Sequence, residues 1–218
     1  MELVSVIVPS YNHEKFLEQR LESIFNQSYP AFEVIILDDC SRDNSRAIIS
    51  KYRSHPKVAS IVFNEKNSGS AFIQWKKGIA LARGKYIWIA ESDDYCDLNF
   101  LETAVSKMSQ GYRLFYCRNI NIDSEGTPRE NQTRWCDDLI PGRWQADFEN
   151  EGREEIREFL SLKNTINNAS AVVFRNEPAL QDYLGKVMSF RYCGDWVFWL
   201  QYLDAPGKLY YSCAVNNY

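Results

Sequence analysis

Three acidic side chains follow a short apolar run in the middle of the chain. Residues 86–90, Tyr-Ile-Trp-Ile-Ala, are typical of a buried strand, and Glu91, Asp93 and Asp94 come directly after them. Desolvated acids do not stabilise a packed sheet, so such a cluster needs a partner that offsets their mutual repulsion. A divalent cation bearing a phosphate is one such partner, because carboxylate oxygens suit Mg²⁺ or Mn²⁺. The alternative is a solvated acidic turn, and these residues alone leave both interpretations open.

Strands and helices alternate through the first half of the chain. Apolar runs predict strands at 4–8, 34–37, 58–63 and 86–90. Apolar residues at helical spacing predict intervening helices near 14–27, 43–53 and 72–82, and another after the acids, around 101–108. This alternation predicts a parallel sheet with helices on both faces, in which ligands bind beyond the carboxyl ends of the strands. The residues at those ends, 9–12, 38–39 and 91–94, should therefore lie along one edge.

The second half of the chain is less regular. We expect sheet at 114–117, 120–122, 171–174 and 209–212. We also expect a short helix around 156–160, a final helix around 196–203, and an irregular polar segment at 124–152. We predict one continuous domain over 1–218, softly divided near residue 110. Because the ending is strand-like and lacks a polar tail, we expect this domain to be cut from a longer protein.

Composition narrows the class of protein. The 218 residues carry a net charge of −4, which argues against a general nucleic-acid binder. No apolar run approaches the roughly 20 residues of a membrane span, so we expect neither a transmembrane segment nor a signal peptide. The six cysteines are scattered, as in proteins with reduced thiols, and we predict a cytoplasmic location.

The position of the first glycine is informative as well. No glycine precedes Gly69, so the glycine-rich turns that hold a dinucleotide or a nucleoside triphosphate after a first strand are absent. A nucleotide bound to this sheet must be held in another way, through its base and a bridging metal.

The order and spacing of several segments resemble family 2 glycosyltransferases. The matching segments are VSVIVPSYN (4–12), SYP (28–30), VIILDDCSRD (34–43), NSG (67–69), ARGKYI (82–87) and ESDD (91–94). The resemblance covers about residues 3–110 and resumes near 169–175 and 194–196. It implies an α/β protein with the GT-A fold: a Rossmann-like, mostly parallel sheet flanked by helices, with a nucleotide-sugar-binding half (1–110) and a less regular acceptor-side half (111–218).

The resemblance also implies roles for residues at the first two strand ends. Pro9 and Tyr11 would line the base pocket, and Tyr11 would stack on the base. Asp39 would accept a hydrogen bond from the imide of a uracil. The alternative for Asp38 and Asp39 is a pair of turn acids.

In the third motif, Glu91-Ser92-Asp93 looks like the Asp-x-Asp element of the family. Glu91 and Ser92 would lie near the ribose, and Asp93 would bind the metal that bridges the phosphates. Glutamate departs from the usual aspartate and places its charge one methylene farther out. We interpret Asp94 as a helix-start acid or an acceptor-side group.

The resemblance makes Asp195 the catalytic base, whose alternative is a simple helix N-cap. A second departure lies at Trp75-Lys76, where family members often carry Arg-Asn. His13, beside the base pocket, and His55 are interpreted as structural or solvated.

Two further segments are candidates for the acceptor side. One is the segment 124–152, whose aromatic and basic residues would either face a sugar or form a small separate core beneath a long loop. These residues are Arg129, Arg134, Trp135, Arg143 and Trp144. The other is 167–170, which precedes the strand that typically lines the acceptor side.

Together these features predict an inverting, metal-dependent glycosyltransferase with Mn²⁺ or Mg²⁺ as cofactor. The expected donor is a UDP-sugar, and the expected acceptor is a glycan or lipid-linked molecule in cell-surface polysaccharide synthesis. A lipid-linked acceptor would bring the protein to the inner face of the membrane as a peripheral protein. Two alternatives stay open: a nucleotidyltransferase, and a domain that binds nucleotide sugar or glycan without turnover.

Overall fold

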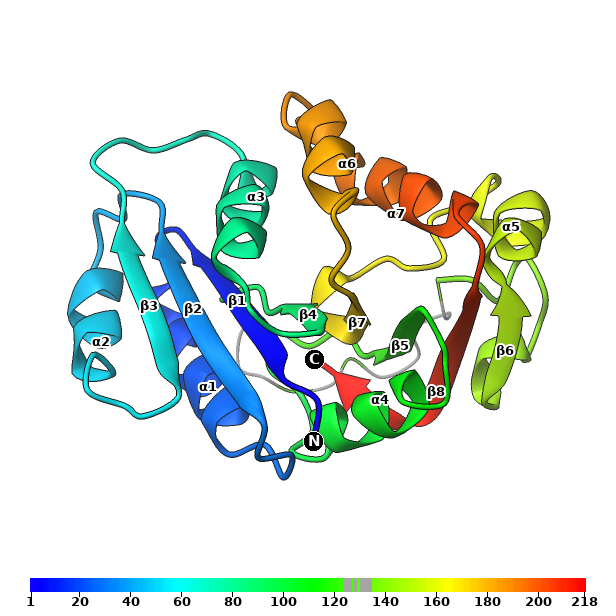
Figure 1. The fold of residues 1–218 in the computed structure, drawn as a ribbon, viewed down its shortest axis with the longest axis horizontal. Helices are drawn as coiled ribbons and strands as arrows, with labels where there is room; N and C mark the ends of the chain where they lie inside the picture. Colours follow the sequence, from blue (N-terminus) through cyan, green and yellow to red (C-terminus); the bar gives the residue numbers. More distant parts are fainter. Residues whose placement is uncertain (124–126, 128, 130–134) are drawn as a thin grey trace.

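The computed structural model describes residues 1–123, 127, 129 and 135–218, and its described strands form one sheet in the order β3-β2-β1-β4-β7-β5-β8-β6 (Figure 1). The strands are β1 Val4–Ser10, β2 Phe32–Asp38, β3 Val58–Phe63, β4 Tyr86–Ile89, β5 Leu114–Asn119, β6 Phe148–Glu151, β7 Val172–Arg175 and β8 Lys208–Asn217. The two halves of the sequence therefore share a continuous sheet.

The sheet is parallel on the side of the N-terminal half and mixed on the other side. β3, β2, β1 and β4 pair in parallel, as the alternation of strands and helices predicts. β7 then lies between β4 and β5 and runs antiparallel to both, so it joins the two halves. β5 and β8 pair in parallel, and β6 closes the edge in antiparallel register with β8.

Helices cover both faces of the sheet. One face packs against α1 Glu14–Phe25, α2 Ser45–Lys51 and α4 Phe100–Met108, and the other packs against α3 Ala71–Leu81, α6 Leu180–Val187 and α7 Gly194–Asp204. Alternate side chains of β1 point to opposite faces, so Val6 and Val8 join the first core and Ile7 joins the second. Burial on both faces explains the continuous apolar runs in the sequence.

The packing of α3 on β1 depends on a residue without a side chain. A Cβ at Gly78 would overlap the side chain of Ile7, so the helix approaches the strand at this point only because residue 78 is glycine. This close approach places the N-terminal turn of α3 next to the carboxyl end of β1.

The second half differs from the prediction in several elements. Helix α6 and strand β6 were not predicted, and 120–122 forms no strand of its own after β5. The short helix near 156–160 is a π-helical turn, η2 Ile156–Leu160, after a four-residue helix, α5 Gly152–Glu155. Short elements at an edge carry too few residues for a clear periodicity. Within the part of the chain that the structure describes, no helix has the length and apolar character needed to cross a membrane.

Candidate active site

A cavity of about 340 Å³ opens at the carboxyl edge of the parallel strands. Its walls come from the segments that follow β1, β2, β3 and β4. The lining includes five of the six residues predicted to bind the nucleotide, namely Pro9, Tyr11, Asp39, Glu91 and Ser92. These residues come from three strand ends, and the sheet brings them together because parallel strands end at the same edge.

The turns after β1 and β2 hold each other in place. The backbone N–H of Asn12 donates to the hydroxyl of Ser41 (3.0 Å), and the side-chain oxygen of Asn12 accepts from the backbone N–H of Arg42 (2.8 Å). Asn12 and Cys40 have positive φ angles of 57° and 66°, in the left-handed region. The two turns therefore form one interlocked wall of the cavity, beside Tyr11.

Asp38 and Asp39 have different roles in the structure. Asp38 is fully buried and binds the guanidinium of Arg46 and the backbone N–H of Ser41, so it is a structural turn acid. Asp39 lines the cavity, and its carboxylate accepts hydrogen bonds from three side chains, Asn64, Ser68 and Gln74, and from the Ser68 backbone N–H. Its Oδ2 accepts two hydrogen bonds, both from Ser68: one from the backbone N–H (3.0 Å) and one from the hydroxyl (2.7 Å).

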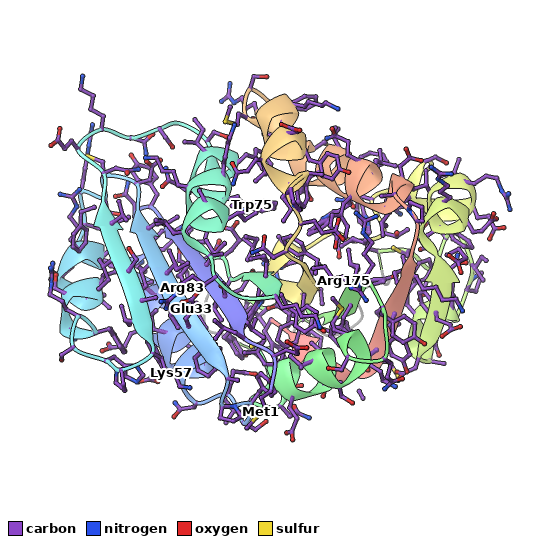
Figure 2. All side chains as sticks on the ribbon, viewed as in Figure 1. Met1, Glu33, Lys57, Trp75, Arg83 and Arg175 are labelled. Atoms are coloured by element: carbon purple, nitrogen blue, oxygen red, sulfur yellow. The ribbon has the colours of Figure 1, made fainter. Side chains whose placement is uncertain are left out.

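The carboxyl group of Glu91 points toward α3. The indole N–H of Trp75, which Figure 2 labels on that helix, donates a 2.7 Å hydrogen bond to Oε1 of Glu91. Burial raises the pKa of Glu91 to about 8; the Trp75 hydrogen bond opposes this, and the charges of Asp93 and Asp94 add to it. Glu91 and Trp75, each part of an expected departure from the family pattern, are therefore in contact.

A buried arginine lies beneath the acids. Arg20 of α1 is 0% exposed, its Nε donates to the carbonyl of Glu91 (3.0 Å), and its guanidinium lies 5.0 Å from the ring centroid of Trp88. Burial raises the pKa of Asp94, and the positive charge of Arg20 opposes that rise. Sequence reasoning missed Arg20, although a charged residue on the apolar face of α1, between Leu17 and Ile24, was the available signal.

Asp93 lies outside the lining of the cavity and its side chain is half exposed. His13 lies beside it: its Nδ1 is 3.8 Å from Asp93 Oδ1 and 2.8 Å from Ser92 Oγ. His13 is therefore a structural partner of the motif, and it also lines the cavity. The described residues contain no group of three His, Cys, Asp or Glu side chains arranged to hold a metal. Asp93 remains available as a single carboxylate, which fits Mg²⁺, since that ion keeps several waters and shares its shell with substrate phosphates.

Asp195 lies in the first turn of α7 and does not cap the helix. The N-cap position belongs to Cys193, and no side chain makes a capping hydrogen bond there. The carboxylate of Asp195 instead accepts a 2.9 Å hydrogen bond from the side chain of Asn164. A Cβ at Gly194 would overlap the ring of Phe72 in α3, so this glycine lets the start of α7 approach α3.

Residues 164–170 connect Asp195 with the acidic motif. Asn164 binds Asp195 at one end of the segment, and at the other end Ser170 Oγ accepts from the backbone N–H of Glu91 (2.9 Å). Hydrogen bonds with Ser170 and Asn168 lower the pKa of Asp94, against the larger effect of burial. Asp94 precedes α4 by several residues, so it is not a helix-start acid and faces this segment instead. The sequence indicated 167–170 but not Asn164.

The remaining predictions for the acceptor side have mixed outcomes. Arg143 forms an ion pair with the fully buried Glu155 (2.7 Å) and is structural. Trp144 is buried, whereas Trp135 is 55% exposed and donates to the carbonyl of Asn164 (2.8 Å). Arg134 lies outside the described residues. His55 packs on Phe25, with their ring centroids 4.0 Å apart, and is structural.

Residues 5–184 match the model of glycosyl transferase family 2. A putative teichuronic acid biosynthesis glycosyltransferase of Bacillus subtilis, TuaG, is 35% identical over 127 residues, which cover 58% of this chain and 50% of the relative. Chondroitin synthase of Escherichia coli is 35% identical over 136 residues, which cover 61% of this chain and 19% of the relative. The chain thus spans half or less of the length of these relatives.

The fold has a counterpart among solved structures. TarS of Staphylococcus aureus, residues 1–349 in complex with UDP-GlcNAc, superposes with a TM-score of 0.72 over 99% of this chain and 58% of that chain, at 21% identity. At that identity the likeness shows the fold, and it confirms the predicted GT-A class. The family model covers most of the chain, and the chain belongs to glycosyl transferase family 2.

Proposed function

We propose that the protein transfers one sugar from a UDP-sugar to a hydroxyl group of a glycan or lipid-linked acceptor, with inversion at the anomeric carbon. The observation that carries the proposal is the cavity at the carboxyl edge of β1, β2 and β4, in which Tyr11, Asp39 and Glu91 converge. Two acids with proposed roles, Asp93 and Asp195, lie outside its lining. Asp93 belongs to the same motif as Glu91, and Asp195 is linked to Glu91 through hydrogen bonds of residues 164–170.

The proposed donor site uses each wall of the cavity for one part of the nucleotide. Tyr11 is 40% exposed, so its ring is free to stack on a base. Asp39 Oδ2 would accept from the uracil imide in exchange for the Ser68 hydroxyl, while Asn64 and Gln74 hold the other carboxylate oxygen in position. Glu91 and Ser92 would lie near the ribose. This arrangement supports a base with an imide N–H, such as uracil, over cytosine, which has no such donor.

The proposed reaction is a single displacement. The acceptor oxygen forms a bond to the anomeric carbon as the bond between that carbon and the diphosphate oxygen breaks, and the diphosphate leaves with the electron pair. Asp195 takes the proton of the attacking hydroxyl group, whose pKa is too high for unaided attack. Asn164 holds the carboxylate of Asp195 in one orientation. A divalent cation on Asp93, when bound, supplies electrostatic stabilisation of the leaving diphosphate.

The names of similar proteins support a role in cell-surface polysaccharide synthesis. TuaG is named for teichuronic acid biosynthesis, and a TarS protein is named as a poly(ribitol-phosphate) β-N-acetylglucosaminyltransferase. We therefore propose a cell-surface polymer as the end product. For a lipid-linked acceptor, we propose peripheral association of the protein with the cytoplasmic face of the membrane.

The test is a calorimetric titration of UDP with and without Mn²⁺, on the wild type and two variants, Asp39→Asn and Asp93→Asn. We expect Mn²⁺-dependent binding to the wild type, weaker binding to Asp39→Asn, and loss of the Mn²⁺ effect in Asp93→Asn. Asp204→Asn, at the exposed far end of α7, is the matched control and should bind as the wild type does.

Metal-independent binding would remove the proposed role of Asp93. If UDP does not bind at all while the protein is folded, the donor assignment is wrong. A protein that binds UDP-sugar but transfers no sugar to water or to any acceptor, with Asp195 intact, would instead be a binding domain.

A further inference from the structure

A second cavity, of about 470 Å³, lies on the acceptor-side half of the protein. It opens where β5 ends and is bounded by residues from the segment after β5, from β8 and from the segment before β7. Its lining includes two arginines, Arg118 and Arg129, and the amide side chains of Asn119 and Asn167. None of the functional residues assigned above lines this cavity.

The charge of this cavity is one-sided. Among the described residues that line it, two are arginines and none is an aspartate or a glutamate. Glu155 lies close enough to Tyr116 in the wall to raise the pKa of that phenol, after the larger effect of burial. The charge of Glu155 is already matched by Arg143, whose guanidinium binds both of its carboxylate oxygens. The described residues of the lining therefore present positive charge with no compensating acid among them.

Two polar groups of the cavity wall lack partners. Arg118 Nε is buried and has no hydrogen-bond partner among the described residues, and the same holds for the hydroxyl of Thr165. Thr165 is only 3% exposed. Because buried polar groups are almost always hydrogen-bonded, each such group indicates a missing partner. An anion with several oxygens can accept hydrogen bonds from an arginine and from a hydroxyl.

We propose that this cavity binds an anionic group of the acceptor, either the carboxylate of an acidic sugar or the phosphate of a polyol-phosphate chain. Both groups offer oxygens that match the donor geometry of a guanidinium. The aromatic side chain of Trp144 and the amides of Asn119 and Asn167 supply the flat apolar and polar contacts that a sugar or polyol backbone uses. This inference rests on the proposed transferase function and adds the chemical class of its acceptor.

The location of the cavity is consistent with an acceptor site. Thr165 and Asn167 line it, and they belong to the same segment in which Asn164 binds Asp195 and Ser170 binds the backbone of Glu91. Thr165 directly follows Asn164, whose side chain binds Asp195, so an acceptor anchored at Thr165 would be bound next to the residue that holds the proposed base. The cavity and the reaction site share one connecting segment.

The inference is tested by titrating three oligomers of equal length into the protein, with and without UDP: an oligogalacturonate, an oligomer of glycerol phosphate, and a neutral malto-oligosaccharide. At least one anionic oligomer should bind, more tightly than the neutral one and with an affinity that falls with added salt. Its Kd should rise about tenfold in Arg118→Gln, the effect expected for one charge-assisted hydrogen bond. Arg118→Lys should retain part of the affinity, and Thr165→Val should weaken binding independently of charge.

The matched control is Arg157→Gln, which removes an exposed arginine that lines neither cavity. UDP affinity should be unchanged in all of these variants. Equal binding of neutral and anionic oligomers, no binding of either anionic oligomer, or a loss of affinity as large in Arg157→Gln as in Arg118→Gln would overturn the proposal. If the anionic oligomers bind in the expected order but UDP does not bind, the proposed transferase function is wrong and the proposed anion site is supported.

Discussion

The indole N–H of Trp75 donates a hydrogen bond of 2.7 Å to the carboxyl group of Glu91. Trp75 lies in α3 and is 3% exposed, and Glu91 follows β4 and lines the 340 Å³ cavity at the carboxyl edge of the sheet. The resemblance to the family predicts a different residue type at each of these positions. The longer side chain of glutamate reaches the indole of α3, so the two departures form a single interaction.

This interaction predicts that the two residues are coupled energetically. Trp75→Phe and Glu91→Asp should each raise the Kd for UDP by about fivefold to tenfold, because each breaks the same hydrogen bond and leaves a buried polar group. The double variant should lose less UDP-binding free energy than the sum of the losses in the two single variants. A double-mutant cycle should give a coupling free energy of about 1 kcal/mol. Additive effects, measured by calorimetry, would show that the two residues act separately.

Asp195 is predicted to act in the chemical step alone. Asp195→Asn should lower kcat by about two to four orders of magnitude, the range for loss of a general base, with little change in the Kd for UDP. The measurement is initial-rate transfer alongside UDP titration, with Asp204→Asn as control. A variant that keeps wild-type kcat would assign the proton transfer to another group.

Asn164 is predicted to position Asp195. Asn164→Ala should lower kcat about tenfold and leave the Kd for UDP unchanged, since it removes the hydrogen bond that orients the carboxylate. Because a side chain near the acceptor could also affect KM, both constants should be measured. If Asn164→Ala raises KM for the acceptor with kcat intact, the residue binds substrate and does not orient the base.

Gly194 is predicted to set the distance between α7 and α3. Gly194→Ala should destabilise the protein by about 1–3 kcal/mol and lower kcat, because the new methyl group would overlap the ring of Phe72. Phe72→Leu removes part of that ring, so the double variant should recover both thermal stability and activity. The comparison is made by thermal unfolding and rate assays. If Phe72→Leu restores neither stability nor activity to Gly194→Ala, the loss arises from the backbone conformation of residue 194 and not from overlap with Phe72.

Glu33 is predicted to make stability depend on pH in acid. Burial raises the pKa of Glu33, but hydrogen bonds from Arg83 and Ser5 outweigh it and lower the pKa below its usual value. Figure 2 labels Glu33 and Arg83 side by side. The ionised form is thus favoured in the folded state. Its stabilisation is present above the unfolded-state pKa of about 4.3 and is lost as the pH falls through the lower folded-state pKa.

The corresponding variant is Glu33→Gln. It should lose about 1 kcal/mol at neutral pH, a modest value because Arg83 is largely exposed, and its Tm should fall less steeply than that of the wild type below about pH 4. Glu158→Gln, an exposed acid in an ion pair, is the control. Parallel curves of Tm against pH for the wild type and Glu33→Gln would contradict this role.

Local sequence determined the parallel half of the sheet and the edge where the cavity opens. The runs that became β1, β2 and β4 are buried on both faces and therefore continuously apolar, a pattern visible without any partner strand. Because consecutive parallel strands end at one edge, the positions of Tyr11, Asp39 and Glu91 followed directly. Family resemblance added expected roles to these positions, and those roles stay predictions.

Tertiary structure alone decided which distant residues surround those positions. β7 enters the sheet antiparallel between β4 and β5, and no local periodicity encodes the choice of a neighbour strand. The contacts of Glu91 with Arg20, Trp75 and Ser170 join residues 71, 16 and 79 positions away in sequence. Such contacts arise when helices pack on a sheet, and their partners are set by packing geometry. The same reason explains why the cavity at Arg118 and Thr165, built from segments far apart in sequence, appeared only in the folded protein.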